Sequence, residues 1–162
     1  EDEFVTHQLD PNLKMNPPLR TEDDRQALLQ GLRDGTIDVI ATDHAPHAVH
    51  EKDDDFPGVP FGVIGLETAV GVLVDRLVSQ GELSPARLAE AMSINPRIIL
   101  GIHGGLLEKD APADITLVSM KKWKVEPEKF ASLARNTPFA GWELTGKAVM
   151  TISGGIIVHD EL

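Results

Sequence analysis

The sequence predicts an α/β fold that is followed by a β-rich tail. Between residues 21 and 101, helix signals flank one short β-branched run, in the order helix, strand, long loop, helix. This order is typical of one unit of an α/β barrel, in which functional residues follow the strands. After Gly101, glycines and a proline interrupt the chain, and β-branched runs follow. We therefore predict two parts, the C-terminal part of a barrel over 1–105 and a β-rich tail over 106–162.

The first helix is predicted to begin after Thr21 and to end at Gly35. The Thr21 hydroxyl can cap the helix, Asp24 adds negative charge to the first turn, and glycine favours a helix end. Residues 37–42 are Ile-Asp-Val-Ile-Ala-Thr, a β-branched run bounded by Gly35 and a proline. This run predicts a buried strand.

Three further helix signals follow the long loop. Over residues 65–79, apolar side chains recur at helical spacing on one face. Ser84 precedes Pro85, which is typical of an N-cap followed by proline in the first helical turn. Asn95–Pro96 repeats this signal and predicts the start of another helix.

The tail carries strand and turn signals. Residues 114–118, Asp-Ile-Thr-Leu-Val, predict a strand. Residues 148–152 and 156–158 are apolar, and Gly154–Gly155 lies between them. A Gly-Gly pair between two such runs predicts a hairpin.

Composition excludes several classes of protein. The 162 residues carry a formal net charge of −11, which argues against a nucleic-acid partner. Cysteine is absent, so disulfides and thiolate metal sites are excluded, and the expected location is cytoplasmic. No apolar run of about 18 residues predicts a membrane span, and no signal peptide is visible. Because the chain starts at Glu1 rather than at methionine, we expect it to be part of a longer protein.

A cluster of polar residues follows the predicted strand. Asp43, His44 and His47 place one carboxylate and two imidazoles there. A carboxylate in this position can bind a hard divalent metal and accept a proton from water bound to it. An aspartate-capped turn with solvated histidines explains the same residues equally well, because short clusters of this kind are common.

The surrounding segments resemble a known family. Ala41 to His47, ATDHAPH, resembles a signature of the dihydroorotases in the amidohydrolase superfamily. KMNPPLR at 14–20 and PFGVIGLET at 60–68 resemble two further segments of that family. Residues 105–119 and 136–139 resemble its C-terminal tail, and all of these segments occur in the family's order.

The resemblance implies a metal-dependent hydrolase with a TIM-type (β/α)8 barrel and a tail that belongs to a small β-sandwich. It implies zinc-dependent, reversible hydrolysis of L-dihydroorotate to N-carbamoyl-L-aspartate in pyrimidine biosynthesis, with two zinc ions per complete site. Asp43 matches the catalytic aspartate that binds one metal and relays a proton. Asn16, His47, Phe61 and Gly62 match substrate-contacting positions.

The chain lacks other parts of the family's site. The HxH metal ligands and the arginine that binds the substrate carboxylate do not occur in it. We therefore expect an N-terminal remainder to supply them, and activity only in its presence. We also expect residues 56–62 to form a mobile lid. For Arg20 we favour a structural ion pair over substrate contact, for His44 a turn-holding role, and for His7 a solvated position.

Two alternatives stay open. The first is another cyclic amidohydrolase of the hydantoinase or allantoinase type. The second is a non-catalytic dihydroorotase homologue that stabilises aspartate carbamoyltransferase. A homodimer and a complex with aspartate carbamoyltransferase are the candidate assemblies. His50, His103 and His159 are expected to have no chemical role, and the acidic run 51–55 to be a solvated loop face.

Overall fold

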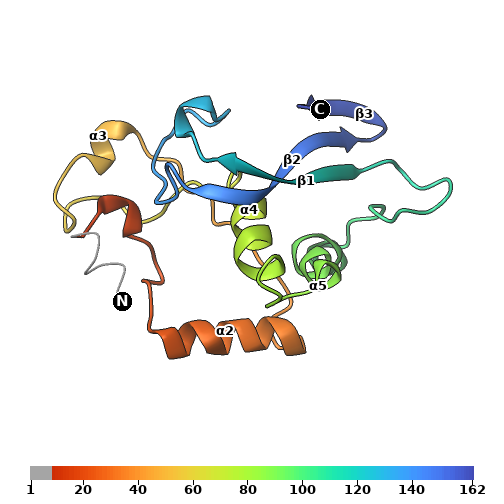
Figure 1. Cartoon of the computed structure of the whole chain (residues 1–162), viewed down its shortest axis with the longest axis horizontal. Coiled ribbons are helices and arrows are strands. Elements are labelled where there is room, and N and C mark those ends of the chain that lie inside the picture. The colour runs from red at the N-terminus through yellow and green to blue at the C-terminus, as the bar shows by residue number, and fades with distance from the viewer. Residues whose placement is uncertain (1–8) are drawn as a thin grey trace. The chain divides into compact units, whose positions relative to one another are not determined.

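The structure is a computed structural model that describes residues 9–162 (Figure 1). Its helical elements are η1 (Pro11–Leu13), α2 (Glu22–Asp34), α3 (Val49–Lys52), α4 (Ala69–Leu73), η2 (Val74–Val78), α5 (Pro85–Ala89), η3 (Glu90–Ile94), α6 (Asn95–Leu100) and η4 (Pro127–Lys129). Of these, η1 and η4 are 3₁₀ turns, whereas η2 and η3 are π-helical turns. The strands are β1 (Ile115–Lys124), β2 (Glu143–Ser153) and β3 (Ile156–Asp160).

The described chain forms two compact units, and neither is continuous in sequence. The first unit contains the residues up to 31 together with 42–69 and 124–142. The second contains 32–41, 70–123 and 143–162. The division of the chain at residue 105 into a barrel part and a tail stays a prediction.

Helix α2 confirms the predicted boundaries. The Thr21 hydroxyl accepts a hydrogen bond from the backbone N–H of Asp24 at 3.3 Å, and the Asp24 carboxylate accepts one from the backbone N–H of Thr21 at 3.3 Å. This reciprocal pair satisfies donors that the first helical turn would otherwise leave unpaired. At the other end, Gly35 has a φ of 83°, a left-handed conformation that suits glycine after a helix.

The predicted strand over 37–42 is wrong, because this segment runs without a strand partner. Its backbone groups bond to the helices of the second unit instead. The N–H of Ile40 donates to the Ala91 carbonyl at 3.0 Å, and the carbonyl of Ile37 accepts from the Arg87 guanidinium at 2.7 Å. A strand requires a neighbour to complete its ladder, and no described strand lies beside this segment.

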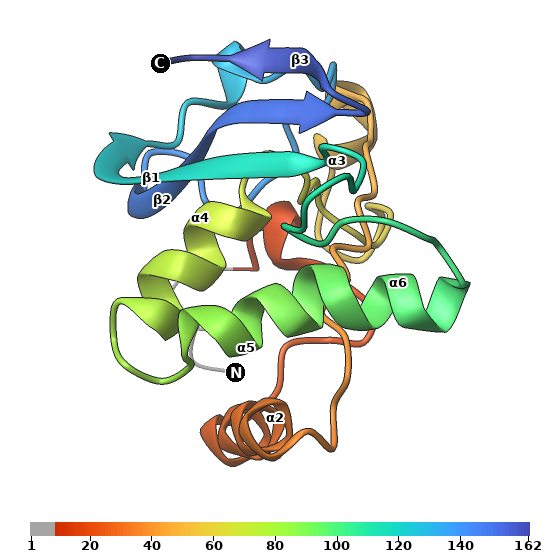
Figure 2. The ribbon, with the colours of Figure 1, turned by 90° about the vertical axis from the view of Figure 1, so that its right-hand side faces the viewer.

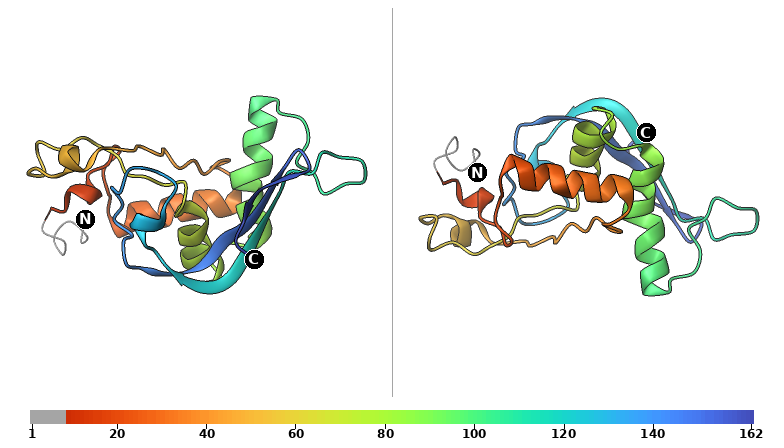
Figure 3. Two further views of the ribbon diagram at one scale, coloured as in Figure 1. Left: turned by 90° about the horizontal axis from the view of Figure 1, so that it is seen from above. Right: turned by 90° about the horizontal axis from the view of Figure 1, so that it is seen from below.

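The helical signals after the loop are confirmed in part. The helix predicted over 65–79 begins later, at Ala69, and continues through η2. Ser84 caps α5 as predicted, because its hydroxyl accepts from the N–H of Arg87 at 3.1 Å. Helix α6 begins at Asn95, as predicted, but it follows η3 without a break, so α5, η3 and α6 form one continuous rod (Figure 3). Asn95 is itself helical, and its amide donates to the Asp38 carbonyl at 2.8 Å.

The tail forms a three-stranded sheet with β2 between β1 and β3 (Figure 2). The predicted strand at 114–118 is confirmed by β1, which is longer than predicted. The hairpin is confirmed as well, since β2 and β3 pair antiparallel, with Ser153 opposite Ile156. The core of the second unit consists of Val74, Leu83 and Leu88, against which partly buried apolar side chains pack. No helix among residues 9–162 is long and apolar enough to cross a membrane.

Candidate active site

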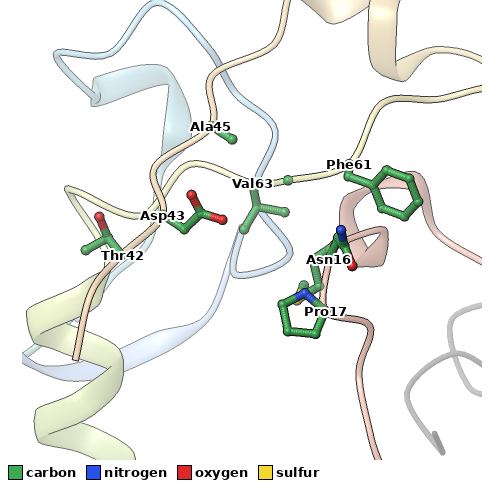
Figure 4. A pocket seen from close by; sticks show the side chains of 9 residues that line it. Asn16, Pro17, Thr42, Asp43, Ala45, Phe61 and Val63 are labelled. Atoms are coloured by element: carbon green, nitrogen blue, oxygen red, sulfur yellow. The ribbon is translucent and has the colours of Figure 1, made fainter. Parts of the chain in front are cut away.

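A pocket of about 430 Å³ lies within the first unit (Figure 4). Three segments contribute its walls, one from each of the sequence motifs noted above. The lining residues are Met15, Asn16, Pro17, Thr42, Asp43, Ala45, Phe61, Gly62 and Val63. Four of the five predicted site residues therefore meet at one pocket, although they are up to 46 positions apart in sequence.

Asp43 presents its carboxylate to this pocket from a strained backbone position. Its φ is 45°, in the left-handed region that few residues other than glycine adopt. Figure 4 shows the carboxylate turned toward Val63 and the interior of the pocket. Strain of this kind is concentrated at functional sites, where the surrounding structure holds it in place.

The surroundings of Asp43 provide one group that could bind a metal ion, which is the Asp43 carboxylate itself. Its side chain is exposed, and no hydrogen bond or ion pair to its carboxylate is found within residues 9–162. The same residues contain no group of three or more histidine, cysteine, aspartate or glutamate side chains that could hold a metal ion. A site built here would therefore need further ligands.

His44 holds the turn behind Asp43, as predicted. Its Nδ1 accepts hydrogen bonds from the backbone N–H groups of Gly65, at 3.1 Å, and Leu66, at 3.4 Å. Because Nδ1 is the acceptor, the proton of the neutral ring lies on Nε2. The ring thus joins the Asp43 turn to the residues that precede α4.

His47 does not line the pocket. Its Nε2 lies 2.9 Å from the carbonyl oxygen of Phe61, and a carbonyl can only accept, so this nitrogen donates. Its Nδ1 lies 3.8 Å from the Glu51 carboxylate. His47 therefore contacts the pocket indirectly, because it bonds to the backbone of the lining residue Phe61.

Phe61 and Gly62 form the opposite wall. The Phe61 side chain is 57% exposed beside the pocket. Gly62 has a φ of 106°, and a Cβ at this position would lie 2.5 Å from the Cβ of Ala45. The backbone conformation and the lack of space for a Cβ both require glycine here. The absence of a side chain lets the segment of Gly62 pack directly against Ala45.

Two buried lysines, which the sequence reasoning missed, anchor the loop that carries this wall. Lys14 and Lys52 are each 9% exposed. The Lys14 ammonium donates to the Pro57 carbonyl at 2.9 Å and lies 4.8 Å from the centre of the Phe61 ring. The Lys52 ammonium donates to the carbonyl of Pro60 at 2.7 Å and to that of Pro11 at 3.1 Å.

These anchors bear on two expectations from the sequence. The acidic run at 51–55 is not simply a solvated face, since Lys52 within it is buried. Burial lowers the pKa of Lys52, and the nearby Lys14 ammonium lowers this pKa further, although Asp10 opposes the effect. The same contacts argue against a loop that moves freely as a whole, so ligand-dependent motion over 56–62 stays a prediction.

The remaining predicted residues do not line the pocket. Arg20 forms an exposed ion pair with Asp24 at 3.1 Å, which confirms the structural role favoured for it. His50 and His103 are exposed, and His159 lies 3.8 Å from the Glu161 carboxylate. His7 lies outside the described residues.

Sequence reasoning also missed Asn136, which is 5% exposed. Its side chain bonds to backbone groups of Ala45, His47 and Gly62, on both walls of the pocket. Residues 136–139 entered the sequence resemblance, which could have drawn attention to them. No local pattern, however, indicates contacts that span 74 to 91 positions.

Comparisons with known proteins show the family of the chain. The profile of the amidohydrolase family matches residues 2–158. A dihydroorotase of Brevibacillus brevis is 46% identical over 162 residues, which cover 99% of this chain and 38% of that protein. A dihydroorotase of Elusimicrobium minutum is 52% identical over 145 residues, which cover 89% of this chain and 34% of that protein.

The solved structure of L-hydantoinase from Arthrobacter aurescens is similar as well. It matches with a TM-score of 0.91 and 31% identity, over 99% of this chain and 36% of that one. The chain thus spans little more than a third of the length of these relatives. The family profile covers almost all of the chain, and the chain belongs to the amidohydrolase family.

Proposed function

We propose that this chain is the part of a dihydroorotase that carries the catalytic aspartate. The reaction is the reversible hydrolysis of the cyclic amide of L-dihydroorotate to N-carbamoyl-L-aspartate. The observation that carries the proposal is the unpartnered Asp43 carboxylate in a pocket that also receives Asn16, Phe61 and Gly62. Support comes from dihydroorotases that are 46–52% identical to the chain.

In this proposal, Asp43 has two roles. It is one ligand of a zinc site with two ions, whose other ligands lie outside this chain. Zinc, when bound, supplies an activated hydroxide and polarises the ring carbonyl. Asp43 accepts the proton of the attacking hydroxyl group and delivers it to the ring nitrogen as the amide bond breaks. Its exposed carboxylate has the freedom that two successive proton transfers require.

The other residues bind and orient the substrate. Asn16 offers an amide at the pocket wall, and the Phe61–Gly62 segment offers a ring and peptide groups. Phe61 reduces the access of water to a bound ring. His47 acts through its hydrogen bond to the Phe61 carbonyl, which holds this wall of the pocket.

The proposed architecture is the one that the sequence resemblance implies. Residues 1–105 form the C-terminal part of a TIM-type (β/α)8 barrel, and residues 106–162 contribute strands to a composite β-sandwich. The sheet of β1, β2 and β3 supports the second assignment. The proposed partners are the N-terminal remainder of the enzyme, a second copy and aspartate carbamoyltransferase. The proposed location is cytoplasmic.

A substrate panel tests the function. A full-length protein that contains this segment is purified with zinc and assayed with dihydroorotate, hydantoin and allantoin. Turnover that is greatest on dihydroorotate supports the proposal. The similarity to L-hydantoinase makes a five-membered ring the principal competitor, and preference for hydantoin would overturn the assignment. Bound zinc without turnover of any substrate would favour the non-catalytic homologue.

A further inference from the structure

Asn136 lies behind the pocket and bonds to both of its walls. Its amide nitrogen donates to the Ala45 carbonyl at 2.9 Å and to the Gly62 carbonyl at 3.3 Å. Its side-chain oxygen accepts from the backbone N–H of His47 at 3.2 Å. Its own backbone carbonyl accepts from the N–H of Ile64 at 3.0 Å. One buried residue therefore contacts the turn that carries Asp43 and the wall that carries Phe61.

This amide has no unused polar group on its side chain. Both hydrogens of the nitrogen and one lone pair of the oxygen are engaged. At 5% exposure, water cannot replace a lost partner without rearrangement. A fully satisfied buried amide holds its partners in one arrangement, which is how polar networks specify structure.

The walls also touch each other directly. The N–H of Ala45 donates to the Val63 carbonyl at 3.0 Å, and Nε2 of His47 donates to the Phe61 carbonyl at 2.9 Å. Asn136 adds three bonds that reach both segments, at Ala45, His47 and Gly62, and these further restrict movement of one wall against the other.

The segment that carries Asn136 is itself fixed. Ala134 and Thr137 are 7% and 3% exposed. The N–H of Ser132 donates to the Glu67 carboxylate at 2.9 Å, which ties the segment to the residues before α4. The backbone around Asn136 is therefore held in place independently of the pocket, so its side chain can fix the position of both walls.

We propose that Asn136 is a positioning residue that sets the spacing of the two pocket walls and thereby the affinity for the cyclic substrate. It rests on the proposed function for the identity of that substrate. Asn136 does not touch the reacting atoms, because it is absent from the pocket lining. Its effect passes through the carbonyl of Gly62 and the turn from Asp43 to His47.

Two variants of the full-length enzyme test this role. Asn136→Asp keeps the acceptor for His47 but places an oxygen opposite the carbonyls of Ala45 and Gly62. Asn136→Leu removes all three side-chain bonds at similar volume. Thr137→Val is the control, because within residues 9–162 the Thr137 hydroxyl bonds only in its own segment, to the N–H of Phe139. It changes a side chain that is equally buried and directly adjacent.

We expect kcat/KM for dihydroorotate to fall about 10- to 100-fold in both Asn136 variants, as small misplacements of a binding site do. Most of the fall should lie in KM, since the Phe61–Gly62 wall moves. Thr137→Val should stay within about twofold of wild type. Wild-type KM and kcat in the folded, zinc-loaded Asn136→Asp enzyme would overturn the proposal, whatever its thermal stability.

Hydrogen exchange supplies a readout that does not require the proposed substrate. In Asn136→Leu, the His47 amide loses its acceptor, so exchange over residues 43–47 and 61–64 should accelerate relative to Thr137→Val. If Asn136→Leu does not fold, Asn136→Asp replaces it in this test. Because that variant keeps the acceptor for His47, its faster exchange is expected over residues 61–64. Equal exchange in variant and control would overturn the positioning role. Accelerated exchange in an enzyme that ignores dihydroorotate would reject the substrate and retain Asn136 as a positioning residue.

Discussion

Asp43 satisfies a backbone requirement as well as a chemical one. Its φ of 45° disfavours most side chains, but aspartate and asparagine tolerate the left-handed region because their short polar groups bond locally. A substitution at Asp43 therefore changes two properties at once. Asparagine removes the charge and keeps the backbone preference, whereas alanine removes both.

We predict that Asp43→Asn and Asp43→Ala differ in stability but not in the loss of catalysis. In the full-length enzyme, both should lower kcat by about 10²–10⁴-fold, the usual effect of losing a general acid/base group. Asp43→Ala should in addition destabilise the fold by about 1 kcal/mol, because alanine pays the full left-handed strain. Steady-state kinetics, zinc analysis and urea unfolding measure these effects. Near-normal turnover of zinc-loaded Asp43→Asn would reject the assignment.

Lys52 gives the stability of the fold a pH dependence. Its pKa in the folded state lies below the ordinary value of 10.5, with burial as the main cause. Between these two pKa values, the unfolded chain binds more protons at this position than the folded chain. The free energy of unfolding therefore rises with pH within that window. Below the window, the full penalty of the buried charge remains.

We predict that Lys52→Met and Lys52→Arg both abolish this rise, because neither residue titrates there. The urea midpoint of the wild type, relative to each variant, should increase as the pH is raised toward 10.5. The neutral amine still donates to Pro11 and Pro60, so the loop stays anchored. Parallel pH profiles for the wild type and both variants would contradict the prediction.

At the scale of elements, α4 and η2 pack closely on the sheet at two glycines. A Cβ on Gly71 would lie 2.9 Å from the Gly146 carbonyl oxygen. A Cβ on Gly146 would lie 2.6 Å from the Cβ of Val74. The backbone of β2 therefore packs directly against α4 and η2, with no side chain between them at these two glycines. This close contact fixes the position at which β2 crosses the helices.

We predict that Gly146→Ala destabilises the fold more than Gly81→Ala does. Both glycines have positive φ, 93° and 73°, but nothing lies within 4 Å of a Cβ on Gly81. The control therefore measures backbone strain alone, and the difference measures the clash with Val74. Overpacking of this kind costs about 1–3 kcal/mol. Equal urea midpoints for the two variants would contradict the prediction, because they would mean that β2 can shift away from Val74 without loss of stability.

Elements with local signals could be predicted from the sequence, and those that depend on distant partners could not. The Thr21 cap and the Gly154–Gly155 turn act within a few residues, and both appear as predicted. Residues 37–42 have the composition of a strand, but a strand also needs a neighbour. Asn95 has the composition of a cap, but its amide reaches Asp38 across 57 positions.

The candidate site shows the same division. Asp43, Asn16, Phe61 and Gly62 were assigned through motifs, and they meet at the pocket. Asn136 and the two lysines were not identified from the sequence, because their partners are distant backbone groups, which leave no sequence pattern. The contact between Lys14 and Pro57, for example, spans 43 positions.

At the scale of the whole molecule, this chain spans 38% of the Brevibacillus brevis dihydroorotase, and that fraction limits its ligands. A zinc site usually requires three or four protein ligands. Next to Asp43, Nδ1 of His44 already accepts from backbone N–H groups, and Nε2 of His47 donates to Phe61. In the proposed site, Asp43 is therefore the one ligand from the described residues, and we expect the others to come from the rest of the enzyme.

We predict that the 162-residue chain, purified alone, retains no stoichiometric zinc after dialysis and does not hydrolyse dihydroorotate. A single carboxylate holds zinc weakly, because each ligand in a closed site contributes to the binding free energy. A protein of the relatives' full length should retain two zinc ions under the same dialysis. Its Asp43→Asn variant should retain less, which separates the effect of this ligand from that of the missing segment. Elemental analysis and turnover are measured on all three proteins at equal concentration. If the isolated chain is monomeric, binds two zinc ions and turns over at the full-length rate, then the ligands must lie within it, and the assignment of Asp43 as its single metal ligand is wrong.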